Sequence, residues 1–217
     1  MLEVKGIRVI SFDVTGTLVS EKFVDYFWLE LIPRLFAERH AVSLEEAKRI
    51  VFSKYDEVGK DDIRWYIPGY WFELFDLRVS LREALEEVRK EVEVYDDAKE
   101  ALERLSAKYD LVISSNLSRE FIDVALSALG FRGFKAVFSC VSDLGLTTKT
   151  PSFYSFVASR LRVPPSVVLH VGDDPERDYE SPVKAGLKAL LVVRKGVAEQ
   201  PHVKNLKELL ELLNLVS

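Results

Sequence analysis

The sequence predicts an α/β protein in which helices flank a parallel sheet and a helical segment is inserted into the chain. Short apolar runs rich in β-branched residues recur, and amphipathic helical patterns separate them. One long stretch after the first run has helical periodicity and no convincing strand. Strand alternating with helix is typical of a parallel sheet covered by helices on both faces.

The predicted strands are short runs that suit burial on both faces of a sheet. They span residues 6–12, 111–114, 136–138, 167–171 and 187–193. Helical patterns cover residues 96–108, 118–129, 152–161 and 178–185. In such sheets ligands bind at the carboxyl ends of the strands, so functional side chains are expected just after these runs.

Residues 19–92 form the inserted segment, which we predict to be a helical bundle. Ser43 with Glu46 and Ser80 with Glu83 have the spacing of capping boxes, which mark the starts of helices. All three tryptophans lie in this segment. Residues 1–18 and 93–217 then make up the α/β core.

Composition narrows the possible functions. Hydrophobic residues make up 48% of the 217 residues and charged residues 30%, which predicts a packed globular core. The net charge is −5 without a basic tract, so no nucleic acid partner is expected. No apolar run is long enough to span a membrane, and the first residues lack a signal-peptide layout, so we expect a cytoplasmic protein. Cys140 is the only cysteine, which excludes internal disulfides and cysteine-based zinc clusters.

Acidic residues follow two of the predicted strands. Asp13 ends the first run and is followed by a turn containing Gly16, while Asp173 and Asp174 follow the run 167–171. A glycine turn of this kind exposes backbone N–H groups that attract anions. If the two strand ends converge, their carboxylates repel each other unless a hard cation such as Mg²⁺ lies between them. The alternative is that these aspartates are turn formers or helix caps.

Four motifs in order resemble those of the haloacid dehalogenase (HAD) superfamily. The resemblance covers nearly the whole chain and implies a Rossmann-like core with a helical cap inserted after the first motif. The matching segments are Asp13-Val14-Thr15-Gly16-Thr17, Ser114-Ser115-Asn116, Lys149 in the sequence GLTTKTP, and Gly172-Asp173-Asp174 with Asp178.

The resemblance implies phosphoryl transfer from a small organic phosphate through an aspartyl-phosphate. Asp13 would attack phosphorus. Mg²⁺ would be held by Asp13, the main-chain carbonyl of Thr15 and Asp173. Lys149 would pair with the phosphoryl oxygens and the nucleophile.

The remaining motif residues would support this reaction. Ser115 would donate a hydrogen bond to a phosphoryl oxygen, and Thr15, Gly16 and Asn116 would contribute to substrate binding. Asp178 would orient the lysine or a metal-bound water. Asp174 would ligate through water or cap the next helix.

Two departures from the family pattern affect the predicted site. Most phosphatases of the family carry a second aspartate where this chain has Thr15, which cannot act as acid or base at neutral pH. Turnover of poor leaving groups should therefore be slow. The family lysine directly precedes proline. The best match without a gap places Thr148 at the lysine position, so Lys149 falls one position late. A one-residue bulge would restore Lys149 to the site; otherwise it is a solvated loop residue.

Three functions stay open on this evidence. The leading prediction is a Mg²⁺-dependent phosphatase of small organic phosphates. A metal-independent 2-haloacid dehalogenase is the second, because that branch also lacks the second aspartate, although it lacks the Gly-Asp-Asp segment found here. A degenerate member that binds phosphate ligands or a protein partner is the third.

Other candidate residues carry weaker predictions. We expect His170 to be a packed residue at a strand end and Cys140 to be a small buried hydrophobic side chain. The aromatic cluster at residues 65–72 is either bundle core or a specificity loop over the site. Arg64 or Lys22 could meet a second anionic group of the substrate. The cap hinges are expected near residues 18–21 and 92–95.

Overall fold

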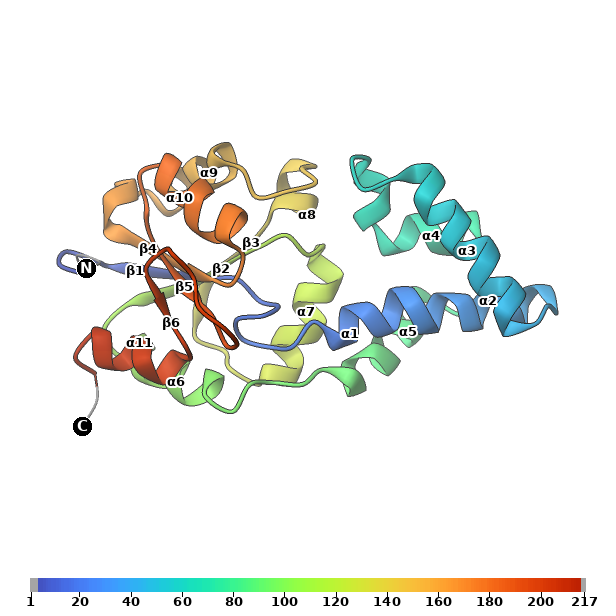
Figure 1. Ribbon diagram of the computed structural model, residues 1–217, viewed down its shortest axis with the longest axis horizontal. Helices are drawn as coiled ribbons and strands as arrows, with labels where there is room; N and C mark the ends of the chain where they lie inside the picture. The colour runs from blue at the N-terminus through green and yellow to red at the C-terminus, as the bar shows by residue number, and fades with distance from the viewer. Residues whose placement is uncertain (1–3, 216–217) are drawn as a thin grey trace.

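The computed structural model describes residues 4–215 and contains a six-stranded parallel sheet in the order β3-β2-β1-β4-β5-β6. Helices α6 (Ala98–Ser106) and α11 (Leu206–Leu212) cover one face, and α9 (Pro151–Leu161) and α10 (Ser181–Lys184) cover the other (Figure 1). This is the predicted Rossmann-like α/β fold. The strands are β1 (Val9–Phe12), β2 (Asp110–Ser115), β3 (Phe134–Ser139), β4 (Val168–Gly172), β5 (Lys188–Val192) and β6 (His202–Val203).

Strands β1 and β4 lie side by side at the centre of the sheet. All residues of β1 and β4 are buried, as expected for strands covered on both faces. Phe12 of β1 pairs with Val171 of β4, so the residues that follow the two strands leave the sheet side by side. The fold therefore places the two acidic strand ends next to each other.

All five predicted strands are present, with boundaries that differ by a few residues. The sixth strand, β6, is a correction to the prediction, because two residues at the sheet edge carry no detectable periodicity. The helix predicted at 178–185 starts earlier and is divided into a π-helical segment η5 (Pro175–Glu180) followed by α10.

The inserted segment is helical throughout its main part. Ser80 and Glu83 form the complete capping box predicted for α5, whereas at α3 the described bond is the one from the Glu46 N–H to Ser43. The elements in chain order are α1 (Lys22–Asp25), η1 (Tyr26–Leu31), α2 (Ile32–His40), α3 (Leu44–Val58), η2 (Ile63–Tyr66), α4 (Pro68–Leu74), α5 (Leu81–Val88) and η3 (Arg89–Glu91).

Helices α2, α3 and α4 project away from the sheet, and α1 and α5 lie between them and the core (Figure 1). We propose that residues 19–92 act as a cap on a core made of 1–18 and 93–217. Within residues 4–215, no helix is both long and apolar enough to span a membrane.

An aromatic core joins the inserted helices to helix α7 (Arg119–Leu129). Phe23 and Phe27 are fully buried, and their rings lie 6.2 and 4.9 Å from the Phe121 ring of α7. Farther out, Trp71 is fully buried and packs 4.6 Å from Tyr55. Part of the aromatic cluster at residues 65–72 is therefore core. This was one of the two interpretations that the sequence allowed.

Candidate active site

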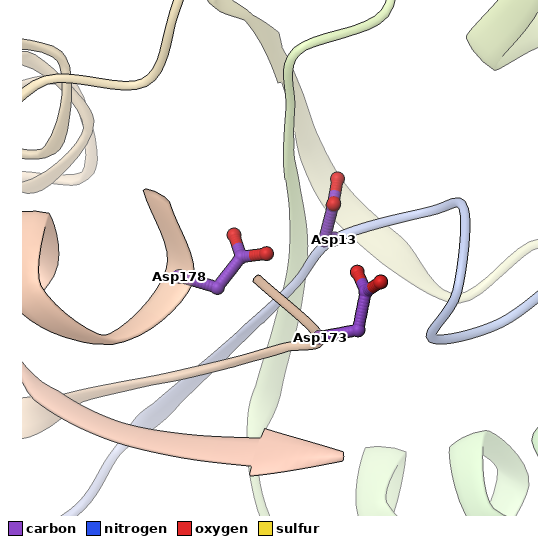
Figure 2. Close-up of side chains that lie close together, drawn as sticks. All are labelled: Asp13, Asp173 and Asp178. Atoms are coloured by element: carbon purple, nitrogen blue, oxygen red, sulfur yellow. The ribbon is translucent and has the colours of Figure 1, made fainter. Parts of the chain in front are cut away.

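Three carboxylates meet at the carboxyl ends of β1 and β4. One oxygen from each of Asp13, Asp173 and Asp178 lies within 4.8 Å of the others. Asp13 is anchored by its backbone N–H, which donates to the carbonyl of Val171 at 2.9 Å. Figure 2 shows the three side chains gathered around the strand ends. The structure thus brings together the acidic residues that the two motifs contribute.

Two glycines make room for these carboxylates. Gly16 has φ +73°, and a Cβ atom built there would overlap the carboxylate of Asp173. A Cβ on Gly172 would overlap the side chain of Asp178. Any larger residue at either position would have to displace a carboxylate, so the glycines are part of the site's geometry.

Lys149 lies inside the site despite its offset in the sequence. It follows α8 (Cys140–Leu144) in the loop that leads to α9, and only 2% of it is exposed. Its Nζ atom is 2.9 Å from Asp13 Oδ2 and also forms an ion pair with Asp178. Burial lowers the pKa of Lys149, but the two carboxylates outweigh this effect and raise it, so the amine stays charged.

A buried hydrogen-bond network fixes Asp178. His170 Nε2 lies 2.9 Å from Asp178 Oδ1, and His170 Nδ1 lies 3.0 Å from the hydroxyl of Ser11. The Tyr154 hydroxyl lies 3.0 Å from His170 Nε2. Burial would raise the pKa of Asp178, but Lys149 and His170 lower it, so this carboxylate stays ionised. His170 is packed as predicted, and burial lowers its pKa.

The contacts of Tyr154 and His170 with Asp178 were missed by the sequence analysis. Tyr154 comes from α9 and His170 from β4, and no motif links them. A tyrosine and a histidine in two unrelated amphipathic segments are indistinguishable from ordinary core residues until the helix is docked on the sheet.

Asp174 caps the helix that follows it. Its Oδ1 atom accepts hydrogen bonds from the backbone N–H groups of Glu176 and Arg177. Its Oδ2 atom binds the guanidinium of Arg177 at 2.7 Å. Of the two roles considered for Asp174, the structure shows the capping one.

The donor set fits a divalent hard cation. Asp13 Oδ1 is buried and has no hydrogen-bond partner among the described residues. Burial, and then the charges of Asp13 and Asp178, raise the pKa of Asp173 to about 7. Three carboxylates therefore gather around the ammonium group of Lys149. Oxygen ligands with this excess negative charge suit Mg²⁺, which would be held by Asp13 and Asp173.

The second motif lies beside this cluster. Ser115 ends β2, and its hydroxyl accepts a hydrogen bond from the Leu117 N–H at 3.3 Å. The Asn116 amide donates to the Thr147 carbonyl at 3.2 Å and accepts from the Cys140 thiol at 2.9 Å. Cys140 is buried as predicted, and burial raises its pKa to about 12, so the thiol is unreactive.

A cavity of about 300 Å³ opens above the carboxylates, between the core and the inserted helices. Thr15, Gly16 and Asn116 line it, whereas Ser115 and Lys149 are not among its lining residues. Lys22 and Arg64 also lie outside the lining and pair with Glu93 and Asp62. The other lining residues are Asp13, Glu21, Val24, Trp28, Trp65, Tyr66, Leu117, Ser118, Phe121, Asp173 and Arg177.

Comparison with known proteins agrees with this geometry. Residues 7–186 match the family model described as haloacid dehalogenase-like hydrolase. The chain belongs to this family. That membership confirms the resemblance drawn from the motifs and makes the protein a HAD-like hydrolase.

The relatives of this HAD-like hydrolase include both branches considered above. It is 22% identical over 205 residues to the GMP/IMP nucleotidase YrfG of Escherichia coli (strain K12), which covers 93% of this chain and 90% of that protein. It is 34% identical over 122 residues to (S)-2-haloacid dehalogenase 4A of Burkholderia cepacia, covering 55% and 52%. The crystal structure of a HAD phosphatase from Thermococcus onnurineus superposes with a TM-score of 0.81 at 24% identity, covering 96% and 99%.

Proposed function

We propose that this HAD-like hydrolase is a Mg²⁺-dependent phosphatase of small organic phosphates that acts through an aspartyl-phosphate. The observation that carries the proposal is the unpartnered, buried Oδ1 of Asp13 beside Asp173, beneath a cavity of small-molecule size. A carboxylate pair of this kind is suited to a cation and a phosphate together. The match to a nucleotidase over 93% of the chain adds support.

Each side chain of the site has a separate role in the proposed reaction. Asp13 attacks phosphorus, and water later hydrolyses the acyl phosphate and restores the carboxylate. Lys149 holds Asp13 in place and keeps positive charge beneath the reacting group. Asp178, through its ion pair, holds Lys149. Bound Mg²⁺ would lower the repulsion between the carboxylates and the incoming phosphate.

A 2-haloacid dehalogenase is the second candidate, because the B. cepacia enzyme is 34% identical over about half of the chain. Thr15 is compatible with it, since halide leaves without a proton. The Asp13–Asp173 pair argues against it, because a metal-independent reaction gives no reason to hold two carboxylates at this distance.

The test measures hydrolysis of p-nitrophenyl phosphate with and without Mg²⁺. We expect activity that chelation abolishes and that Asp13→Asn lowers by about 10³-fold or more. Asp110→Asn, on the exposed start of β2, is the matched control and should retain full activity. Chloride release from a 2-haloacid without metal would instead establish the dehalogenase. Phosphate binding without any turnover would establish a degenerate binding protein.

A further inference from the structure

Aromatic side chains line the cavity that also contains Asp13. Trp28 of η1 and Trp65 of η2 contribute indole rings whose centroids are 5.6 Å apart. The Phe121 ring of α7 lies 5.9 Å from Trp28, and Tyr66 also lines the cavity. The organic part of a phosphate ester held at Asp13 would therefore share the cavity with these planar rings.

Two buried side chains hold the aromatic wall in place. The Tyr55 hydroxyl donates to the carbonyl of Trp28 at 3.2 Å. The Trp71 indole N–H donates to the carbonyl of Trp65, also at 3.2 Å. Both anchoring side chains are buried, so the wall has its shape before a ligand enters. Preorganised rings bind a planar group at low entropic cost.

Among the described lining residues, the one basic side chain is already paired with a carboxylate. Arg177 is the only basic residue among the described lining residues, and its guanidinium is bound to Asp174 at 2.7 Å. Glu21 adds a negative charge to the cap side. A substrate with a carboxylate or a second phosphate would therefore meet the charge of Glu21 and an arginine already paired with Asp174, whereas a neutral ring would meet no like charge.

Thr15 favours the same kind of substrate for a separate reason. It lines the same cavity as Asp13, and its hydroxyl is no acid at neutral pH. A phenol has a pKa near 10 and leaves as a stable anion, whereas an aliphatic alcohol, with a pKa roughly that of water, needs a proton. A site in which residue 15 supplies no acid is therefore better matched to aryl esters than to alkyl esters.

We propose that the substrates are phosphate monoesters of neutral aromatic alcohols, with the ring bound against Trp28, Trp65 and Tyr66. This inference rests on the proposed phosphatase function. As the bond from Asp13 to phosphorus forms, the bond from phosphorus to the aryl oxygen breaks and its electron pair stays on that oxygen. Solvent water then protonates the phenolate, and a second water releases inorganic phosphate from Asp13.

A substrate panel separates ring binding from leaving-group chemistry. Phenyl and 1-naphthyl phosphate have leaving groups of similar acidity, and the larger ring should lower KM about five-fold or more. Phenyl and benzyl phosphate have similar rings, and the aryl ester should show a kcat about 100-fold higher. The anionic 2-phosphoglycolate should have the highest KM of the panel.

Variants of the wall test the placement of the ring. Trp65→Leu and Tyr66→Leu should raise KM for 1-naphthyl phosphate about five- to ten-fold and leave KM for 2-phosphoglycolate within about two-fold. Tyr70→Leu is the matched control, because Tyr70 is a partly buried aromatic residue of the same segment outside the cavity lining. It should leave both KM values unchanged.

A binding measurement keeps the two proposals distinguishable. Calorimetry on Asp13→Asn with Mg²⁺ should show 1-naphthyl phosphate binding about ten-fold more tightly than inorganic phosphate, and Trp65→Leu should remove the difference. Two results would overturn the proposal of an aromatic substrate and leave the phosphatase proposal intact. One is turnover with equal affinities for 1-naphthyl phosphate and inorganic phosphate, and the other is turnover with a preference for 2-phosphoglycolate. Absence of turnover with every ester would overturn the phosphatase proposal. Equal affinities for 1-naphthyl phosphate and inorganic phosphate in calorimetry would then overturn the proposal of aromatic binding as well.

Discussion

Position 15 carries a hydroxyl where most family phosphatases carry a second aspartate. The structure places Thr15 in the cavity wall, two residues after Asp13 and facing the same space. A phosphate bound at Asp13 would therefore share this cavity with the side chain at position 15. Because a threonine hydroxyl neither gives nor takes a proton at neutral pH, leaving-group protonation falls to solvent.

Thr15→Asp should raise kcat for benzyl phosphate by about ten- to 100-fold, because it supplies the missing acid, and should change the p-nitrophenyl phosphate rate little. Steady-state kinetics on the two esters checks this difference. Thr15→Asn is the matched control, since it has the same shape without a titratable proton. Equal gains on both esters, or no gain, would show that protonation does not limit the reaction.

Gly16 provides a second test at the scale of one residue. Gly16→Ala must move the Asp173 carboxylate, and its φ of +73° is strained for alanine. We expect the apparent Mg²⁺ affinity to fall about ten-fold or more. Gly69→Ala, at a helical position with nothing within 4 Å, should leave it unchanged. Unchanged Mg²⁺ affinity in Gly16→Ala would mean that Asp173 is not a ligand.

At the scale of elements, Arg194 ties the loop after β1 to the rest of the core. It follows β5, and its guanidinium donates to the Thr17 carbonyl at 2.8 Å and to the Gly16 carbonyl at 3.3 Å. The same group pairs with Asp97 at 3.0 Å and lies 3.6 Å over the Tyr95 ring. One side chain therefore joins the loop after Asp13 to the segment by which the chain returns from the inserted helices.

Arg194→Gln should lower both stability and catalysis, because it leaves Asp97 without its cation and frees the Gly16–Thr17 turn. We expect the melting temperature to fall by about 5 °C, which is the effect expected from the loss of a partly buried ion pair in a domain of this length. The value of kcat/KM should fall about ten-fold. Lys195→Gln, on the exposed neighbouring residue, should alter neither quantity. Loss of stability without loss of kcat/KM would restrict Arg194 to a structural role.

Across the whole molecule, the acidic site links folding to pH and, if the proposed function holds, to the binding of Mg²⁺. Without metal, the pKa of Asp173 rises from 3.8 to about 7, mainly because of burial and then because of Asp13 and Asp178. The folded state therefore favours protonated Asp173. This contribution to stability is fully present below about pH 4 and is lost as the pH rises to about 7.

Mg²⁺ should instead stabilise the folded state more at high pH, because it binds the ionised carboxylate of Asp173 and competes with the proton. We expect Mg²⁺ to raise the melting temperature more at about pH 8 than at about pH 5.5. Thermal denaturation at the two pH values measures the difference, and Asp173→Asn should remove it. A Mg²⁺-induced shift that is the same at both pH values would show that Asp173 does not exchange its proton for the metal.

Much of the fold was predictable because its signals are local. Buried parallel strands such as β1 and β4 appear as short apolar runs, and the Ser80–Glu83 capping box marks its helix over four residues. Asp13 and Asp173 could be named as site residues because each directly follows such a run. Strand β6 could not be predicted, because two residues at a sheet edge have no periodicity to detect.

The sequence by itself therefore determined the α/β alternation, the inserted helices and the two acidic strand ends, since each depends on neighbours in the chain. Only the tertiary structure decided that Lys149 reaches Asp13 and that His170 and Tyr154 hold Asp178. It also decided that Trp65 faces the cavity while Trp71 is core. These outcomes depend on how loops and helices dock on the sheet, and that docking is set by packing between segments distant in sequence.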